Sequence, residues 1–368
     1  MGLCFDRPDS ALQGMSVSER LGGLVPFGSF ESFEIPQAGD RLRFVWDHLR
    51  SLVLRRPYTW YIHDVNRVKA RLRVLMKGGS FDVVHMDSMD LIALLPELRD
   101  IPVVVTHHNV ESSLLRRRAE AAPNKLVRWY LSHQARLLEI AERWWLPRVA
   151  LNLAVSEGDA ALFLGIAPTA KLAIVANGVD TEYFNPSNVP VDGCVFVGGT
   201  SWYPNLDALE WFVADVLPRL RVRGMHAQVT WVGRASPEEI ERYNRIPGFR
   251  LTGYVPDIRP YVHSAACFIA PIRVGGGTRL KLLDAWAMGK AVVSTSSGAE
   301  GLNYVDGKNI LIADSAESFA DRVMVALTDA GRRRSLEAEA RSVAVREYSW
   351  QVIGAKLRSL YFSLLKVR

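Results

Sequence analysis

The segment VGGGTRLKLLDAWAMGKAVVSTS, from Val274 to Ser296, decides the fold class of this chain. Three consecutive glycines precede a stretch whose apolar residues recur at helical spacing, and β-branched residues follow Gly289. This order predicts a glycine-rich loop, a helix from Arg279 to Met288 that ends at a glycine, and then a buried strand. A loop, a helix and a buried strand in this order are typical of an α/β domain with a parallel sheet.

The predicted helix carries charges that suit an anionic ligand. Gly275, Gly276 and Gly277 would let the backbone approach a ligand closely, and Thr278 is a suitable helix cap. Arg279 and Lys281 then fall in the first turn. The helix dipole makes each cation there unfavourable by about 0.3–1 kcal/mol. A bound anion would explain two cations at this position, and a diphosphate is the natural candidate.

Asp284 is the second polar group of this predicted helix. Helical geometry puts Lys281 and Asp284 opposite the apolar residues that would pack on the sheet, so Asp284 could accept hydrogen bonds from a ribose. The alternative is an ordinary ion pair between two residues three positions apart, beside a plain loop. A second glycine turn, Gly198 and Gly199, favours a ligand site because open α/β sheets bind ligands where strands end.

The same alternation of short apolar runs and amphipathic segments extends through both halves of the chain. It predicts parallel strands and helices arranged as two Rossmann-like domains. The strands expected in the second half are 194–199, 227–233, 249–255, 267–272, 291–296 and 309–313, with helices at 237–243, 279–288, 316–328 and 332–346 and another that begins at Pro204. In the first half we expect strands 81–86, 102–106, 150–155 and 171–176, helices 41–56, 65–77 and 112–146, and two less regular strands at 2–5 and 30–35.

Composition narrows the class of protein. A chain of 368 residues with 49% hydrophobic and 23% charged residues is globular and long enough for two domains. Three widely spaced cysteines argue against a disulfide framework and favour a reducing, cytoplasmic setting. The sequence has no Cys/His cluster typical of a metal site, no apolar run long enough to span a bilayer, and no signal-peptide pattern at its start.

Several motifs together resemble, in order and spacing, the donor domain of the family 4 glycosyltransferases. They are ANGVDTEYFNP (176–186), FVGGTSWYPN (196–205), GRASPEE (233–239), LTGYVPDIRPYV (251–262) and GGGTRLKLLDAWAMGKAVVSTSSGAEGL (275–302). HHNVE (107–111) is similar to a first-domain segment of one subgroup of the family. The resemblance runs from about Phe81 to the C-terminus. It implies the GT-B fold, in which two Rossmann-like domains face each other.

The resemblance also implies an activity. Such enzymes transfer a sugar from a nucleoside-diphosphate sugar to a saccharide or lipid-linked acceptor, with retention of configuration and without a required metal or other cofactor. The absence of an Asp-x-Asp motif agrees with this, and Arg279 and Lys281 would stabilise the departing diphosphate. By resemblance, Asp284 binds the ribose, backbone groups at Val255 meet the base, and His108 approaches the donor sugar. The alternative for His108 is a histidine at a strand end that bonds to backbone.

Departures from the family pattern leave other functions open. Gly276 stands where an acidic residue is common, and Gly199 and Asn205 stand near the usual arginine and lysine. The resemblance also implies that the chain lacks the first strand, loop and helix of its first domain. The alternative function is therefore a truncated module that binds a nucleotide sugar without turnover. A nucleotide-sugar epimerase is a weaker third hypothesis.

The expected organisation is an incomplete first domain over residues 1–176, a donor domain over residues 177–347, and a helix at 348–368 that packs back on the first domain. Residues 41–77 hold ten basic residues against two aspartates. This window could bind an anionic membrane surface, through the apolar stripe of the helix at 65–77. The alternative is a surface helix that packs this stripe on its own sheet. We expect no nucleic-acid partner, because no recognition motif accompanies the charge.

Overall fold

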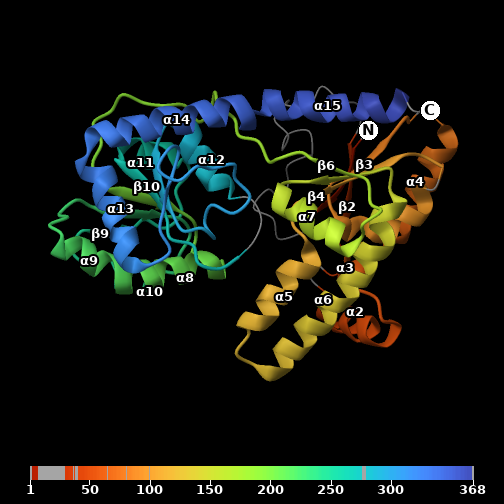
Figure 1. Ribbon diagram of the computed structural model, residues 1–368. Coiled ribbons are helices and arrows are strands. Elements are labelled where there is room, and N and C mark those ends of the chain that lie inside the picture. The colour runs from red at the N-terminus through yellow and green to blue at the C-terminus, as the bar shows by residue number, and fades with distance from the viewer. Residues whose placement is uncertain are drawn as a thin grey trace. The chain divides into compact units, whose positions relative to one another are not determined.

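A computed structural model describes residues 2–6, 30–35, 37, 40–63, 65–79, 81–98, 100–275 and 279–366 of the chain. The chain divides into two compact units. Unit 1 comprises residues 1–154 and 160–173, and unit 2 comprises residues 155–159 and 174–367. Each unit contains parallel strands accompanied by helices (Figure 1). The division falls next to the turn-rich segment 176–193.

Unit 2 is built on one six-stranded parallel sheet. Its strands are β7 (Cys194–Val197), β8 (Val229–Val232), β9 (Phe249–Leu251), β10 (Cys267–Ala270), β11 (Ala291–Ser294) and β12 (Leu311–Ile312). Their order is β12-β11-β10-β7-β8-β9, and every pairing between neighbours is parallel. All six strands fall within the expected ranges and are shorter than expected, because the residues after each strand turn away at the sheet edge.

Helices cover both faces of this sheet (Figure 1). They are α8 (Tyr203–Trp211), the π-helix η3 (Phe212–Val216), α9 (Leu217–Val222), α10 (Pro237–Asn244), α11 (Arg259–Ser264), α12 (Leu280–Ala287), α13 (Ala316–Thr328) and α14 (Ala330–Tyr348). The next helix along the chain is α15 (Trp350–Lys366). Alternate residues of β7 enter two separate cores. Phe196 packs with α8, η3 and α13, whereas Val195 packs with α12 and α14. Burial on both faces explains the continuous apolar runs of the strands.

The connection from β9 to β10 changes the direction in which the sheet grows. The chain runs outward from β7 through β8 to β9, and then returns through α11 to place β10 on the other side of β7. Ligands of open α/β sheets bind at such a switch point, beyond the carboxyl ends of the strands. In this chain the two segments that leave the switch point are Gly198–Gly199 after β7 and 271–275 after β10.

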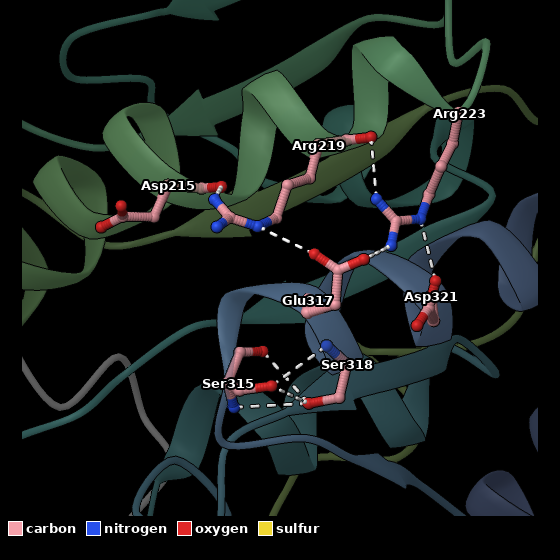
Figure 2. A network of polar contacts seen from close by, with 7 residues as sticks. All are labelled: Asp215, Arg219, Arg223, Ser315, Glu317, Ser318 and Asp321. Atoms are coloured by element: carbon pink, nitrogen blue, oxygen red, sulfur yellow. Dashed lines mark hydrogen bonds and ion pairs between the residues drawn. The ribbon is translucent and has the colours of Figure 1, made fainter.

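Polar contacts fasten α13 to α9 on the outer side of unit 2 (Figure 2). The Glu317 carboxylate pairs with Arg219 Nε at 3.0 Å and with the Arg223 guanidinium. Asp321 accepts from Arg223 Nε at 2.8 Å, and Ser315 caps the helix by accepting from the backbone N–H of Ser318. These contacts are exposed, so they orient α13 while the apolar core supplies most of its stability.

Unit 1 contains two groups of strands. β1 (Gly2–Asp6) pairs in parallel with β2 (Phe30–Glu34), and a four-stranded sheet has the order β3-β4-β5-β6. The bounds of those four strands are β3 (Val84–Met86), β4 (Val103–His107), β5 (Leu151–Ala154) and β6 (Leu172–Ile174). The helices are α2 (Arg41–Leu54), α3 (Thr59–Ile62), α4 (Asn66–Gly78), the 3-10 helix η1 (Met89–Leu98), α5 (Glu111–Ala121), α6 (Lys125–Trp145), the 3-10 turn η2 (Leu146–Arg148) and α7 (Glu157–Ile166).

The prediction of one long helix over 112–146 is wrong. The chain forms α5 and α6 instead, which pack against each other as an antiparallel pair (Figure 1). The break falls at Pro123 and Asn124, where the Asn124 side chain accepts from the backbone N–H groups of Leu126 at 2.8 Å and Val127 at 3.2 Å. An N-cap of this kind starts a new helix. The sequence analysis also missed α3, η1 and α7.

Among the described residues, no helix is long and apolar enough to cross a bilayer. The domain boundaries, the missing first strand of the first domain, and the packing of the C-terminal helix on that domain all remain predictions.

Candidate functional site

The residues predicted to bind a diphosphate gather at the switch point of unit 2. Gly198 follows β7, and Lys281 lies in the first turn of α12, which follows β10. A Cβ atom added at Gly198 would lie 2.7 Å from Lys281 Nζ and 2.7 Å from Asn205 Nδ2. Only a residue without a side chain lets the backbone turn this close to the lysine. The structure therefore brings the Gly198 turn next to the start of α12.

Lys281 is held between a polar and an aromatic partner. Its Nζ donates a hydrogen bond of 2.8 Å to Asn205 Oδ1 and lies 4.2 Å from the centre of the Phe196 ring. Burial and the neighbouring positive charge of Arg279 lower the pKa of Lys281 to about 7. The amine is thus at the point of losing its proton at neutral pH. An anion beside it would restore the charge.

Arg279 is a buried cation at the start of α12. It occupies the N-cap position and is 4% exposed, with its guanidinium 5.7 Å from the centre of the Trp202 ring. The helix therefore begins one residue later than predicted, and the predicted cap residue was Thr278. Thr278 itself lies outside the described residues, with Gly276 and Gly277. Gly275 is described and has a φ of 119°, which favours glycine.

Asp284 lies one turn beyond Lys281 on α12. Burial raises the pKa of its carboxyl group to about 7. Leu282, Leu283 and Trp286 are 0% exposed and form the opposite, sheet-facing side of the helix, as the periodicity predicted. The side of α12 that carries Lys281 and Asp284 therefore turns away from the core.

Three further residues border this edge of the sheet. Gly199 approaches the Arg234 carbonyl so closely that an added Cβ would lie 2.9 Å from that oxygen. The guanidinium of Arg234 is exposed and lies 5.0 Å from the centre of the Tyr254 ring, and this cation–π contact orients the arginine side chain. Val255 is partly buried and packs on the core beneath α12. Its predicted role in base binding remains a prediction.

Sequence reasoning missed the part played by Asn205. It appeared only as a departure from the family pattern, yet its side chain links the two loops by donating to the Gly199 carbonyl at 2.9 Å while accepting from Lys281. Asn205 follows Gly199 by six residues and lies in the first turn of α8, and this position was the available signal. A nearby cation, Arg273, pairs with Asp207 at 2.7 Å and is therefore already neutralised.

His108, the candidate in unit 1, pairs with a carboxylate. It follows β4, and its Nε2 lies 3.3 Å from Asp87 Oδ1, beyond the end of β3. Asp87 raises the pKa of His108, and His108 lowers that of Asp87. The preceding residue, His107, is 2% exposed and bonds to Asn152 Oδ1 at 3.0 Å, and burial lowers its pKa to about 4. His107 is therefore the structural histidine of this segment.

Two more carboxyl groups lie beside His108, and the sequence analysis gave neither a role. Burial and the nearby Asp90 raise the pKa of Glu111 to about 7, and burial raises the pKa of Asp90. Glu111 is the last residue of HHNVE, so the motif contained the signal. The ends of β3 and β4 thus hold titratable groups with shifted pKa values, of which that of Glu111 lies near neutral pH. In the described part of the chain, no three His, Cys, Asp or Glu residues are arranged to hold a metal ion.

Each half of the chain matches a sequence model of a glycosyltransferase family. Residues 31–183 match the sequence model described as Glycosyltransferase Family 4, and residues 192–329 match the one described as Glycosyl transferases group 1. A curated relative from Klebsiella pneumoniae, described as an uncharacterized 44.6 kDa protein in the cps region, is 29% identical over 138 residues. That match covers 35% of this chain and 36% of the relative.

Solved structures match most of the chain. Anabaena HepE in complex with UDP superposes with a TM-score of 0.64 at 12% identity, over 98% of this chain and 99% of HepE. Sucrose-phosphate synthase from Thermosynechococcus elongatus matches with a TM-score of 0.64 at 15% identity, over 82% of this chain and 78% of that protein. A glycosyltransferase from Rickettsia africae has a TM-score of 0.61 at 13% identity, covering 99% of this chain and 98% of that protein. The predicted fold class, two Rossmann-like domains of the GT-B type, is confirmed.

Proposed function

We propose that the chain is a GT4-like glycosyltransferase that transfers a sugar from a nucleoside-diphosphate sugar to a saccharide or lipid-linked acceptor, a proposal supported by the two family matches and by the GT-B fold. Retention of anomeric configuration and independence of metal are part of the proposal. Complexes of HepE with UDP and with UDP-glucose support a uridine nucleotide as the first donor to test.

The observation that carries the proposal is the buried lysine at the switch point. Lys281 Nζ lies at the Gly198 turn, with Arg279 at the N-cap of the same helix. Two neighbouring cations at one helix start repel each other, and the pKa of Lys281 is lowered first by desolvation and then by this repulsion. A diphosphate would offset the repulsion and accept hydrogen bonds from both side chains.

In the proposed reaction, the bond between the anomeric carbon and the diphosphate oxygen breaks, and the acceptor oxygen bonds to that carbon. Negative charge grows on the departing diphosphate as the bond breaks. Lys281 and Arg279 would stabilise this charge at the transition state more than in the bound donor, which is the requirement for acceleration. The acceptor hydroxyl loses one proton, which leaves with the diphosphate or passes to a nearby base. Asp284 would orient the donor through its ribose.

The test is nucleoside-diphosphate release by the purified chain from a panel of nucleotide sugars, measured with and without membrane extract as a source of acceptor. Acceptor-dependent release that disappears in Lys281→Ala is the expected result. Thermal stabilisation by a nucleotide sugar without any release would favour the alternative function, a binding module without turnover. If no nucleotide sugar gives either thermal stabilisation or release, the proposal is refuted.

A further inference from the structure

Helix α2 presents the opposite of the usual arrangement of a surface helix. Its buried residues are polar: Asp47 is 2% exposed and Ser51 is 0% exposed. Its exposed residues include five large apolar side chains, namely Leu42, Val45, Trp46, Leu49 and Val53, which we call the α2 stripe. A surface helix ordinarily turns its apolar side to the core.

The α2 stripe is continuous. At about 100° per residue, its five members fall in a band about 100° wide on the side of the helix away from Asp47 and Ser51. Leu42 is 84% exposed and Val53 is 79% exposed, so the ends of the stripe are as open as its middle.

Polar contacts fix this orientation from inside. Gln37 Nε2 donates to Asp47 Oδ2 at 2.6 Å, and Ser51 Oγ accepts from Gln134 Nε2 of α6 at 2.8 Å. A rotation that buried the stripe would strip these groups of their partners, at about 1–3 kcal/mol for each group left unsatisfied. The apolar side of α2 therefore stays outward.

The neighbouring helix α6 also has exposed apolar residues. The Tyr130 hydroxyl on α6 hydrogen-bonds His48 on α2, so the two helices lie side by side (Figure 1). Near Tyr130, Leu126 is 78% exposed and Trp129 is 60% exposed.

Basic residues border the α2 stripe on both sides. Arg43 and Arg50 follow one edge and Arg41 the other, while Arg55 and Arg56 come directly after the helix. Residues 40–56 contain five arginines and only two aspartates. One of these aspartates, Asp47, is buried beside Arg43. An apolar stripe with a tryptophan, flanked by arginines, has the charge and shape that suit an anionic bilayer surface.

The other amphipathic helix of this basic region behaves in the ordinary way. Val68 and Leu72 of α4 are 1% and 7% exposed and belong to the core of unit 1. The apolar stripe at 65–77 is therefore a packing face, and its predicted use as a membrane face is wrong. The contrast singles out α2 within the same basic window.

We propose that α2 is a docking helix for an anionic membrane surface. Its apolar stripe enters the boundary between headgroups and acyl chains, and its flanking arginines contact lipid phosphates. This inference does not depend on glycosyl transfer, since binding to lipid can be measured without any donor or acceptor.

The experiment compares vesicles of phosphatidylcholine alone with vesicles that contain about 30% phosphatidylglycerol, in a flotation assay with the full chain. The double variant Leu49→Asp/Val53→Asp removes two stripe residues without touching the buried side of α2. Its control, Val222→Asp/Val345→Asp, places the same charges at exposed positions of α9 and α14 in unit 2. Circular dichroism checks that both variants fold.

We expect the wild type and the control to float with anionic vesicles, and the stripe variant to lose at least about tenfold in binding. Equal binding by both variants, or no binding by the wild type, overturns the proposal. Light scattering tests whether a second copy of the chain covers the α2 stripe instead. If the wild type is a dimer and only the stripe variant disrupts it, α2 is an interface between copies and the membrane proposal is overturned.

Discussion

Lys281 Nζ on α12 donates a hydrogen bond of 2.8 Å to Asn205 Oδ1 on α8, which joins the segments that follow β10 and β7. The two strands are neighbours in the sheet although 69 residues of other structure separate them in the chain. A neutral amide is a modest partner for an ammonium group. The lysine therefore keeps most of its capacity to bind an anion that enters between the two segments.

Replacing this lysine tests the diphosphate assignment. Lys281→Ala removes the cation that would stabilise the departing diphosphate, and we expect kcat to fall by about 10²-fold or more. Loss of the charge should not destabilise the fold, because a lysine whose pKa is lowered by burial is itself unfavourable to folding at neutral pH. Asn205→Ala is the matched control, since it leaves the charge in place and should reduce release far less. An unchanged turnover rate in Lys281→Ala would remove the assignment.

The pKa of Lys281 gives binding a characteristic pH dependence. With a pKa of about 7 in the free protein, the amine is mostly neutral at pH 8, so a diphosphate must bind together with a proton. We expect UDP affinity to decrease by up to about tenfold per pH unit above pH 7. Calorimetry in buffers of different ionisation enthalpy should report uptake of close to one proton at pH 8. Lys281→Ala should abolish that uptake, and uptake that persists in the variant would assign it to another group.

We expect the Asp284 carboxylate to lower the stability of the fold while it strengthens ligand binding. Burial raises its pKa to about 7, so folding at pH 8 requires an ionised carboxylate to be buried, whereas the unfolded chain ionises freely above about pH 4. Asp284→Asn removes that cost and should raise the melting temperature at pH 8, with a smaller gain at pH 5. The same variant should bind a nucleoside diphosphate more weakly if the carboxylate holds the ribose. A lower melting temperature at pH 8 would contradict the prediction.

Asp87 is a positioning residue for His108. Its carboxylate raises the pKa of the imidazole, so Asp87→Asn should lower that pKa. NMR titration of the imidazole resonances, with His108→Ala used for assignment, measures this directly. If protonated His108 takes part in transfer, the high-pH limb of the rate profile should move downward by the same amount in Asp87→Asn. If Asp87→Asn lowers the pKa of His108 but leaves the pH–rate profile unchanged, His108 does not act as an acid.

The sequence predicted the architecture of unit 2 well because its strands are buried on both faces. Such strands read as continuous apolar runs, and Phe196 and Val195 belong to opposite cores of the same strand. Prediction was weaker in unit 1, where local signals compete. The cap at Asn124 divides one periodic segment into two helices, and η1 forms from an apolar run that has no helical period of its own.

Composition alone does not distinguish the two amphipathic helices of the basic window, α2 and α4. Both α2 and α4 have apolar stripes and basic flanks. What distinguishes them is which side meets the rest of unit 1, and for α2 that depends on Gln37 and Gln134, side chains far from each other in sequence. The site in unit 2 was predictable because glycine turns and charged helix starts are local features. The partner Asn205 was not, because its role depends on contact across two strands.

The strand order of unit 2 also sets the sequence in which the site can form during synthesis. β7, residues 194–197, can pair with β8 as soon as both have left the ribosome, but its other neighbour, β10, is made only when residues 267–270 appear. The Lys281 contact needs both neighbours. The nascent chain therefore builds an open half-sheet first and completes the Lys281 contact late, through a long-range pairing that is intrinsically slow.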